Sequence, residues 1–386
     1  LASALSPSPD TEIEAAIDRG RIRTADDTAD EPISEIELEL KKGSVAALYD
    51  LASRLLAEAP LRLEWRSKAE RGFALAAGKA APAEAFHVGP LELDPALSGD
   101  AALQRIGRAG IEHALRNEAT ILAGNAEGVH QMRVAVRRLR AALAGFRKML
   151  PDAERRRASD ELRWLATALG DARNNDAFES ALIEPARRAL GEPAELDALA
   201  AAASRRRGAA YAAARKAIRS SRYTALMLDL LRWFDTCGWR AADRAERLRQ
   251  SIGDIAPTVL DRRRRAAMKQ SRGFARQSPQ QRHRLRIALK KLRYTIELLG
   301  SLYDPEEVER FTKRLKRLQD DLGDANDVRV GQGIVAELVR ANEGSPAIAD
   351  AGHRLIEWHE NRLAEHEGKL RKHLRRLLDK KPFWAS

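Results

Sequence analysis

Cysteine is nearly absent from this sequence, since Cys237 is the only one in 386 residues. An intramolecular disulfide is therefore impossible, and a cysteine-based metal centre is strongly disfavoured. No apolar run approaches the roughly 18 residues needed to cross a bilayer, and the first residues lack the basic and apolar segments of a secretion signal. We therefore expect a cytoplasmic protein without a membrane span.

Aromatic residues are also scarce, at 5% of the chain, whereas 44% of residues are hydrophobic and 32% are charged. The abundant residues, Ala, Leu, Arg and Glu, are good helix formers. This composition is typical of helical globular domains and disfavours β-sandwiches and disordered chains. The length of 386 residues allows two or three domains.

Negative charge is lacking in the C-terminal part of the chain. Residues 1–80 hold 11 Lys/Arg and 15 Asp/Glu, a net charge of −4, whereas residues 81–386 hold 57 and 41, a net charge of +16. A field of one sign attracts polyanions, which include nucleic acid, anionic membrane and polyphosphate. Charge alone does not distinguish these partners from a solvated helical surface.

The first 80 residues have the alternating pattern of strands, with one helix. Short strands are expected at 11–17, 21–24, 33–40 and 61–75. Asp18-Arg19-Gly20 is expected to form a turn between the first two. Ser44 is expected to cap a helix with a leucine-rich face. Residues 81–96, rich in Ala, Gly and Pro, are expected to be a linker to a domain that spans 97–386.

The sequence of the C-terminal domain is duplicated. Residues 130–140, HQMRVAVRRLR, match residues 283–293, HRLRIALKKLR, at an offset of 153, and Leu-Gly-Asp-Ala at 169–172 recurs at 322–325 with the same offset. Prolines and glycines, Gly128 and Pro257 among them, are expected to divide the domain into about eight helices. We predict two pseudo-symmetric helical bundles, with internal repeats at about 97–245 and 246–386.

Each matching segment carries two stripes when it is drawn as an α-helix. Apolar residues from Met132 to Phe146, and from Leu285 to Leu299, form core-facing stripes. Basic residues form a second stripe on each helix. We predict an anion-binding set with the cations adjacent to these stripes included: His130, Arg133, Arg137, Arg138 and Arg140 in the first copy, and His283, Arg286, Lys290, Lys291 and Arg293 in the second.

Acidic residues are missing from both helices, since neither 129–147 nor 280–296 contains Asp or Glu. Exposed helices normally alternate charges, because like charges four residues apart repel. An external anion would relieve this repulsion, and guanidinium groups bind phosphate oxygens in pairs. The histidines would add affinity as the pH falls through the neutral range.

The repeated Leu-Gly-Asp segments have a structural interpretation, in which Gly170 and Gly323 end or kink a helix. The polar residues after them are expected to cap the next helix. These are Asn174, Asp176, Asn326 and Asp327. An alternative is that the two aspartates hold the basic side chains.

Three histidines recur every seven residues near the C-terminus: His359, His366 and His373. On a helix, neighbours at this spacing lie roughly 10 Å apart along the axis, which is too far for one metal ion. We expect them to be polar helix residues. The open alternative is that they extend the basic surface.

Residues 97–386 resemble the CHAD domain, the conserved-histidine α-helical domain. The resemblance lies in the two His helices, the two Leu-Gly-Asp segments and the Pro382-Phe383-Trp384 ending. It implies two four-helix bundles around a basic groove that binds inorganic polyphosphate without catalysis or a cofactor, and association with polyphosphate granules in some members. One departure is visible, because Arg173-Asn174 stands where an Arg-Asp pair is expected.

Residues 1–80 resemble part of a CYTH domain, the triphosphate tunnel fold, in Pro32–Lys41 and in Ser67–Gly72. The resemblance implies a partial antiparallel α+β region in which Glu35, Glu37 and Glu39 share a strand face and hold Mg or Mn. Arg62, Arg66 and Lys68 would alternate on another strand as phosphate binders. The opening acidic strand motif of that family is absent from the sequence. An acidic solvent-exposed sheet face is the alternative.

The sequence thus predicts a mainly α protein that binds inorganic polyphosphate. Two other functions remain open at this point. One is an inorganic triphosphatase, if further N-terminal strands complete the CYTH-like region. The other is nucleic-acid binding, which the charge permits, although the two basic helices contain only Phe146 and Tyr294 as aromatic residues for base stacking.

Overall fold

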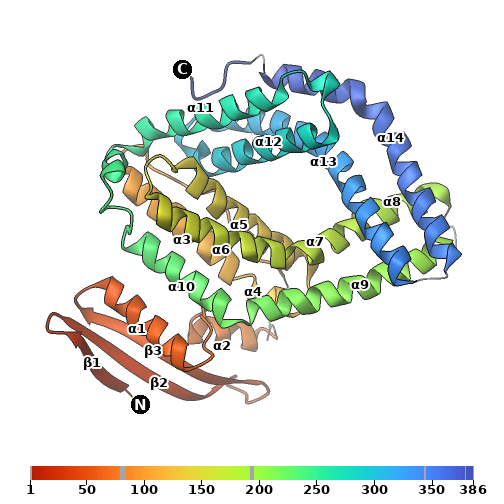
Figure 1. The fold of residues 1–386 in the computed structure, drawn as a ribbon. Helices are drawn as coiled ribbons and strands as arrows, with labels where there is room; N and C mark the ends of the chain where they lie inside the picture. Colours follow the sequence, from red (N-terminus) through yellow and green to blue (C-terminus); the bar gives the residue numbers. More distant parts are fainter. Residues whose placement is uncertain (1, 79–83, 192–194, 343–344, 379, 386) are drawn as a thin grey trace.

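The computed structural model describes residues 2–78, 84–191, 195–342, 345–378 and 380–385. The described chain is mainly helical, with a small antiparallel sheet near its N-terminus, so the expected fold class is confirmed (Figure 1). None of the described helices combines the length and the apolarity that a bilayer span requires.

The sheet is a three-stranded meander in the order β1-β2-β3. Its strands are β1 (Ala2–Ser8), β2 (Thr11–Arg23) and β3 (Asp30–Lys42). The turn predicted at 18–20 is wrong, because β2 continues through it. Asp18 and Gly20 pair with Glu35 and Ile33 of β3, so the long partner strand keeps this segment extended.

Ser44 caps helix α1 (Val45–Glu58) as expected. The strand predicted at 61–75 is wrong, because Lys68–Ala76 form helix α2. Ser67 and Glu70 form a reciprocal capping box at its start, and this motif favours a helix over the apparent alternation. The basic residues in 61–75 therefore do not line a strand.

The C-terminal domain contains twelve α-helices among its described residues, together with short 3₁₀ and π segments. The first half comprises α3 (Gly99–Leu115), α4 (Glu118–Leu122), α5 (Ala126–Gly145), α6 (Asp152–Ala168), α7 (Gly170–Ala177), the π segment η1 (Phe178–Ile183), α8 (Glu184–Leu190), α9 (Glu195–Ile218) and α10 (Ser221–Asp235). The second half comprises η2 (Asp243–Arg249), α11 (Ile252–Ser271), η3 (Phe274–Arg276), α12 (Pro279–Leu299), η4 (Gly300–Leu302), α13 (Pro305–Ala341) and α14 (Pro346–Leu378).

Equivalent helices in the two halves begin 153 residues apart, the same separation as between the repeated sequence motifs. Helices α3, α5 and α6 begin at residues 99, 126 and 152, and α11, α12 and α13 begin 153 residues after them. Ser98 and Ser251, which are related by the same offset, cap α3 and α11 and pair with each other in an antiparallel bridge. Equivalent residues pair with each other in an antiparallel bridge when a twofold axis passes between them. The two halves are therefore related by a pseudo-twofold axis.

Two bundles meet along α5 and α12. One consists of α3, α5, α6 and α10, and the other of α11, α12, α13 and the C-terminal part of α14. The apolar stripes of α5 and α12, represented by Met132, Leu139, Leu285 and Leu292, are buried as expected. They join the two bundles in one continuous core, which fixes how the basic stripes face each other.

A separate apolar core lies at the end of the domain far from the sheet (Figure 1). There η1, α8 and α9 pack against the C-terminal part of α13 and the N-terminal part of α14, with Phe178, Leu182, Ile334 and Leu338 buried. The continuous helix α13 spans the region that corresponds to α6, α7, η1 and α8 in the first copy.

Two predicted helix breaks are wrong. Pro257 lies inside α11. Gly128 lies in the first turn of α5, where a Cβ atom would come within 2.8 Å of the Thr120 side chain. This glycine permits close packing of α4 on α5 and does not end a helix.

The N-terminal region packs on the first bundle, with α1 beside α10 (Figure 1). The Tyr49 hydroxyl donates to Asp235 at 2.5 Å, and Arg62 pairs with Glu118 at 2.7 Å. The described part of the expected linker, residues 84–96, also packs on the helical domain. Phe86 donates its amide to Asn117, and Leu93 is buried. Residues 81–83 lie outside the described chain.

Candidate functional site: a basic groove between two bundles

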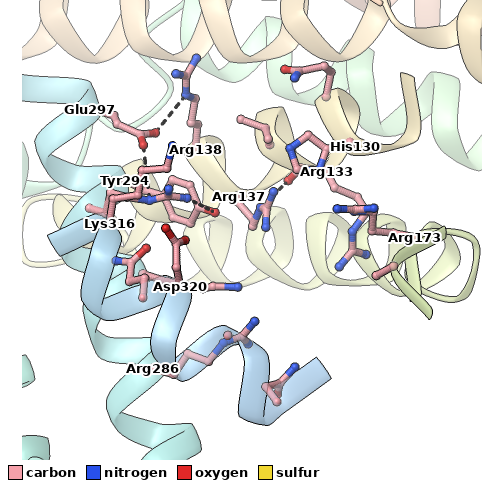
Figure 2. A pocket seen from close by; sticks show the side chains of 18 of the residues that line it. His130, Arg133, Arg137, Arg138, Arg173, Arg286, Tyr294, Glu297, Lys316 and Asp320 are labelled. Carbon is pink, nitrogen blue, oxygen red and sulfur yellow. Dashed lines mark hydrogen bonds and ion pairs between the residues drawn. The ribbon is translucent and has the colours of Figure 1, made fainter. Parts of the chain in front are cut away.

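A cavity of about 770 Å³ lies where α5 and α7 face α12 and α13 (Figure 2). Its described lining includes eight Lys/Arg and four Asp/Glu. The eight cations are Arg133, Arg137, Arg138, Arg173, Arg286, Lys290, Arg293 and Lys316. We refer to this cavity as the basic groove.

Helix α5 supplies one wall with His130, Arg133 and Arg137. Arg133 donates to the carbonyl of Ala166 at 2.6 Å. Arg137 donates to the carbonyl of Arg133 at 3.1 Å (Figure 2). These bonds use neutral acceptors, so they orient the guanidinium groups and leave their charge uncompensated. The side chain of His130 has no hydrogen bond or ion pair among the described residues.

Helix α12 supplies the opposite wall with Arg286 and Lys290. Arg286 lies 3.9 Å from a carboxylate oxygen of Asp327. Lys290 has no hydrogen bond or ion pair to any described residue. His283 does not line the groove. Its Nδ1 atom lies 3.2 Å from the side-chain oxygen of Asn326, which does line it.

The groove ends at a carboxylate that the two helices share. Glu297 lies 3.5 Å from Arg138 of α5 and 3.5 Å from Arg293 of its own helix. Both arginines were predicted as site residues and both line the groove. Arg140 and Lys291 do not. Seven of the ten predicted residues therefore meet in this cavity.

Burial and mutual repulsion shift the ionisation of the groove. Burial, followed by the charges of Arg137 and Arg173, lowers the pKa of Arg133 to about 10. Burial, followed by Arg286 and Arg137, lowers the pKa of Lys290 to about 7. Burial, followed by Arg173 and Arg137, lowers the pKa of His130 to about 4. The three shifts all disfavour the positively charged form of the side chain.

Several residues that line the groove were not predicted from the sequence. Arg173 of α7 and Lys316 of α13 line the groove, and their side chains make no hydrogen bond or ion pair with the described residues. Asp320 and Asp324 of α13 add negative charge on one side. Arg173 directly follows the repeated Leu-Gly-Asp-Ala segment, which was a usable signal. Lys316 lies in no motif.

A family model for the CHAD domain matches residues 105–336, more than half of the chain. This chain belongs to the CHAD domain family. The match does not extend to the N-terminal 80 residues, so it does not support the CYTH-like interpretation. Among curated protein sequences, none matches this chain significantly.

Solved structures that resemble this chain include the following two. The crystal structure of the CHAD domain from the plant Ricinus communis is 28% identical, covers 78% of this chain and 98% of its own, and superposes with a TM-score of 0.66. PptA from Streptomyces chartreusis is 19% identical, covers 72% and 99%, and has a TM-score of 0.52. The second likeness shows the fold alone.

The Leu-Gly-Asp segments differ between the two copies of this CHAD domain. The expected helix break occurs at Gly170, because α6 ends at Ala168 and α7 begins at Gly170. The break expected at Gly323 and the expected side-chain caps are wrong. Gly323 and Asp327 lie inside the continuous helix α13, and α7 has no side-chain cap. The alternative holds for one aspartate, since Asp327 faces Arg286. Asp176 instead accepts hydrogen bonds from Arg207 and Tyr211, outside the groove.

The C-terminal histidines of the CHAD domain have structural contacts. His359 is buried with its Nε2 atom 3.0 Å from the carbonyl of Leu182. The Nδ1 atom of His373 lies 2.8 Å from Asp321. The side chain of His366 lies outside the described residues. The two described histidines lie on the helix as polar residues and do not line the groove.

The acidic strand face of the N-terminal region is occupied by a lysine. Ligand atoms of Asp18, Glu35 and Glu37 lie within 4.8 Å of one another, and Lys68 Nζ contacts all three at 2.6–2.8 Å. Glu39 pairs with Lys41 instead, at 2.8 Å. A divalent ion would have to displace the ammonium group, so these residues do not fit a resident Mg or Mn ion as they stand.

Proposed function

We propose that this CHAD domain binds inorganic polyphosphate in the basic groove. The observation that carries the proposal is the set of cations without counter-groups: Arg173, Lys290 and Lys316 line a partly buried cavity with no hydrogen bond or ion pair to the described residues. A bound polyanion would supply the missing negative charge and offset the burial and the repulsion that together lower the pKa of Lys290.

The distribution of cations favours a polymer over a single phosphate. Arg137, Arg173, Lys290 and Lys316 come from four different helices around one cavity. One phosphate group has three or four oxygens and satisfies a few donors. A chain of phosphates places a negative charge on every unit and can meet cations on both walls.

The groove favours polyphosphate over nucleic acid. Tyr294 is the one Phe, Trp or Tyr among the described lining residues. It is buried, and the guanidinium groups of Arg137 and Arg293 lie 5.4 and 4.9 Å from its ring centre. It therefore presents no free face for base stacking. We further propose that the protein is cytoplasmic and associates there with polyphosphate granules.

Competition binding tests the proposal. Labelled long-chain polyphosphate, bound to the full chain, is titrated with single-stranded DNA or RNA at equal charge concentration. We expect nucleic acid to displace little of it, and Arg137→Ala to weaken polyphosphate binding by about tenfold or more. Arg219→Ala, an exposed arginine outside the groove, is the matched control. Preferential binding of nucleic acid would overturn the assignment.

A further inference from the structure

The pseudo-twofold relates each residue of α5 to a residue of α12. The end of the groove at Glu297 differs from the equivalent position in the other copy. Arg138 and Arg293 share Glu297 as their carboxylate partner. Their equivalents, 153 residues away, are Lys291 and Arg140, the two predicted residues that the groove excludes. The equivalent of Glu297 is Ala144. The counterpart end therefore has both cations but no shared acid.

Three further arginines lie at this counterpart end. Arg262 and Arg263 of α11 stand where α3 has Ala109 and Gly110, and Arg147 stands where the second copy has Gly300. At the Glu297 end, these positions belong to small residues, and Gly110 packs against Leu139. The two copies therefore differ at these positions, and the three additional positive charges lie at one end only.

These five residues act on one another electrostatically. Burial, followed by the charges of Arg263, Arg140 and Arg147, lowers the pKa of Lys291. Burial, followed by Arg262 and Arg147, lowers the pKa of Arg263 to about 10. We call this set the second basic cluster: Arg140, Arg147, Arg262, Arg263 and Lys291.

Two acids on the helices around the cluster already have partners. Asp160, which interacts with Arg140, pairs with Arg163 at 3.2 Å. Asp261 accepts from Trp384 at 2.9 Å and lies 3.5 Å from Arg265. None of the described carboxylates forms an ion pair with a member of the cluster.

Arg263 has buried donors without acceptors. Its Nε and Nη2 atoms are shielded from solvent, yet they have no hydrogen-bond partner. Unpaired buried donors cost free energy. Arg262, in contrast, donates to the carbonyl of Gly145 at 3.0 Å. The second basic cluster therefore contains guanidinium donors that lack an acceptor.

We propose that the second basic cluster is a separate oxyanion site that binds a phosphate group. The planar guanidinium groups of the cluster match phosphate oxygens, and the ammonium group of Lys291 supplies a further point charge. The phosphate comes either from a small soluble phosphate compound or from the polymer that we place in the basic groove. The oxyanion site itself stands on residues outside that groove.

Ala144→Glu tests the site by introducing an acid at the position equivalent to Glu297. Pyrophosphate binding is measured by calorimetry in a chain whose groove carries Arg137→Ala and Lys290→Ala. We expect Ala144→Glu to weaken pyrophosphate binding by about tenfold or more, because it pairs with Lys291 and Arg140 internally. It should also raise the unfolding temperature of the ligand-free chain. Ala144→Gln, of equal size, should preserve binding.

Arg263→Ala serves as an independent variant, with Arg249→Ala, an exposed arginine paired with Glu246, as its control. We expect about tenfold weaker pyrophosphate binding for the first and no change for the second. Unchanged binding in both Ala144→Glu and Arg263→Ala overturns the proposal. An equal loss in Arg249→Ala overturns it too, because diffuse charge would then explain the binding.

Long-chain polyphosphate distinguishes the two sources of the phosphate. With the groove intact, Ala144→Glu weakens binding of the polymer if its end reaches the second basic cluster. It weakens only pyrophosphate binding if the site takes small compounds. Failure of the polymer to bind the groove would leave the pyrophosphate result unaffected, so this site and the proposed function can fail separately.

Discussion

The two copies of the basic helix keep the same stripe of cations but surround it with different partners. Arg133 of α5 donates to a backbone carbonyl, whereas its equivalent Arg286 of α12 faces the carboxylate of Asp327. The residue equivalent to Asp327 in the first copy is the neutral Asn174. The first copy therefore orients its cations without neutralising them, and the second neutralises part of its charge.

This difference makes the groove electrostatically uneven. Asp320, Asp324 and Asp327 all belong to α13, on the side of the second copy. Burial, followed by the other aspartates, raises the pKa of Asp324, so the acids also repel one another. A polyanion in the groove is therefore expected to interact more strongly with the α5 wall than with the α13 wall.

The largest effect is expected from removing one cation on each wall. Arg137→Ala should weaken polyphosphate binding more than Lys290→Ala, because Lys290 is only partly protonated at pH 7. The double variant should lose about a hundredfold or more in affinity. By analogy with protein binding to nucleic-acid phosphates, the slope of log affinity against log salt should fall by about one per lost contact.

Circular dichroism should show that these variants keep their helices, and Arg219→Ala should change neither affinity nor slope. A larger loss of polyphosphate affinity in Lys290→Ala than in Arg137→Ala would contradict the expected difference between the two copies. A similar loss in Arg219→Ala or Arg244→Ala would mean that diffuse charge holds the polymer.

The next effect concerns pH. Ligand-free Lys290 has a pKa of about 7, and a bound polyanion raises it. Between the free and the bound pKa, binding takes up a proton, so affinity should fall as the pH rises above about 7, by up to about tenfold per unit. Lys290→Arg should remove most of this dependence, because guanidinium stays protonated. Affinities for long-chain polyphosphate at pH 7–9 measure it.

The histidines provide the control for this prediction. The sequence suggested that they give the pH dependence in the neutral range, but burial lowers the pKa of His130 to about 4. Replacing His130 and His283 with Gln should leave the slope above pH 7 intact and change affinity mainly in acid. If the pH dependence of affinity persists in Lys290→Arg and is lost when the two histidines are replaced, the histidines and not Lys290 cause it.

The sequence predicted the helical fold and most of the groove because duplication is visible in one chain. The 153-residue offset identified both stripes, and helical geometry then separated the buried face of Leu139 from the basic face of Arg137. Arg140 and Lys291 could not be excluded in this way. Whether a stripe residue faces the groove depends on where α5 crosses α12, and that is a property of tertiary packing.

The N-terminal region was less predictable because its signals were local and competing. Alternation at 61–75 suggested a strand, but the Ser67 and Glu70 capping box favours a helix. Glu35 and Glu37 were correctly placed on one face, and Asp18 joins them through strand pairing. Lys68, predicted as a phosphate binder, binds these carboxylates because α2 packs against β2.

The smallest effect, and the sharpest test of the comparison, comes from exchanging the partner residues of the two copies. Asp327→Asn gives the second copy the neutral residue of the first and should raise polyphosphate affinity about two- to fivefold, since a partly exposed ion pair 3.9 Å long contributes little. Asn174→Asp should lower affinity by a similar factor. If Asp327→Asn instead weakens binding, Asp327 orients Arg286 for the ligand, and the two copies have become specialised. Equilibrium titrations at two salt concentrations separate these outcomes, because loss of a repulsive charge steepens the salt dependence whereas loss of orientation flattens it.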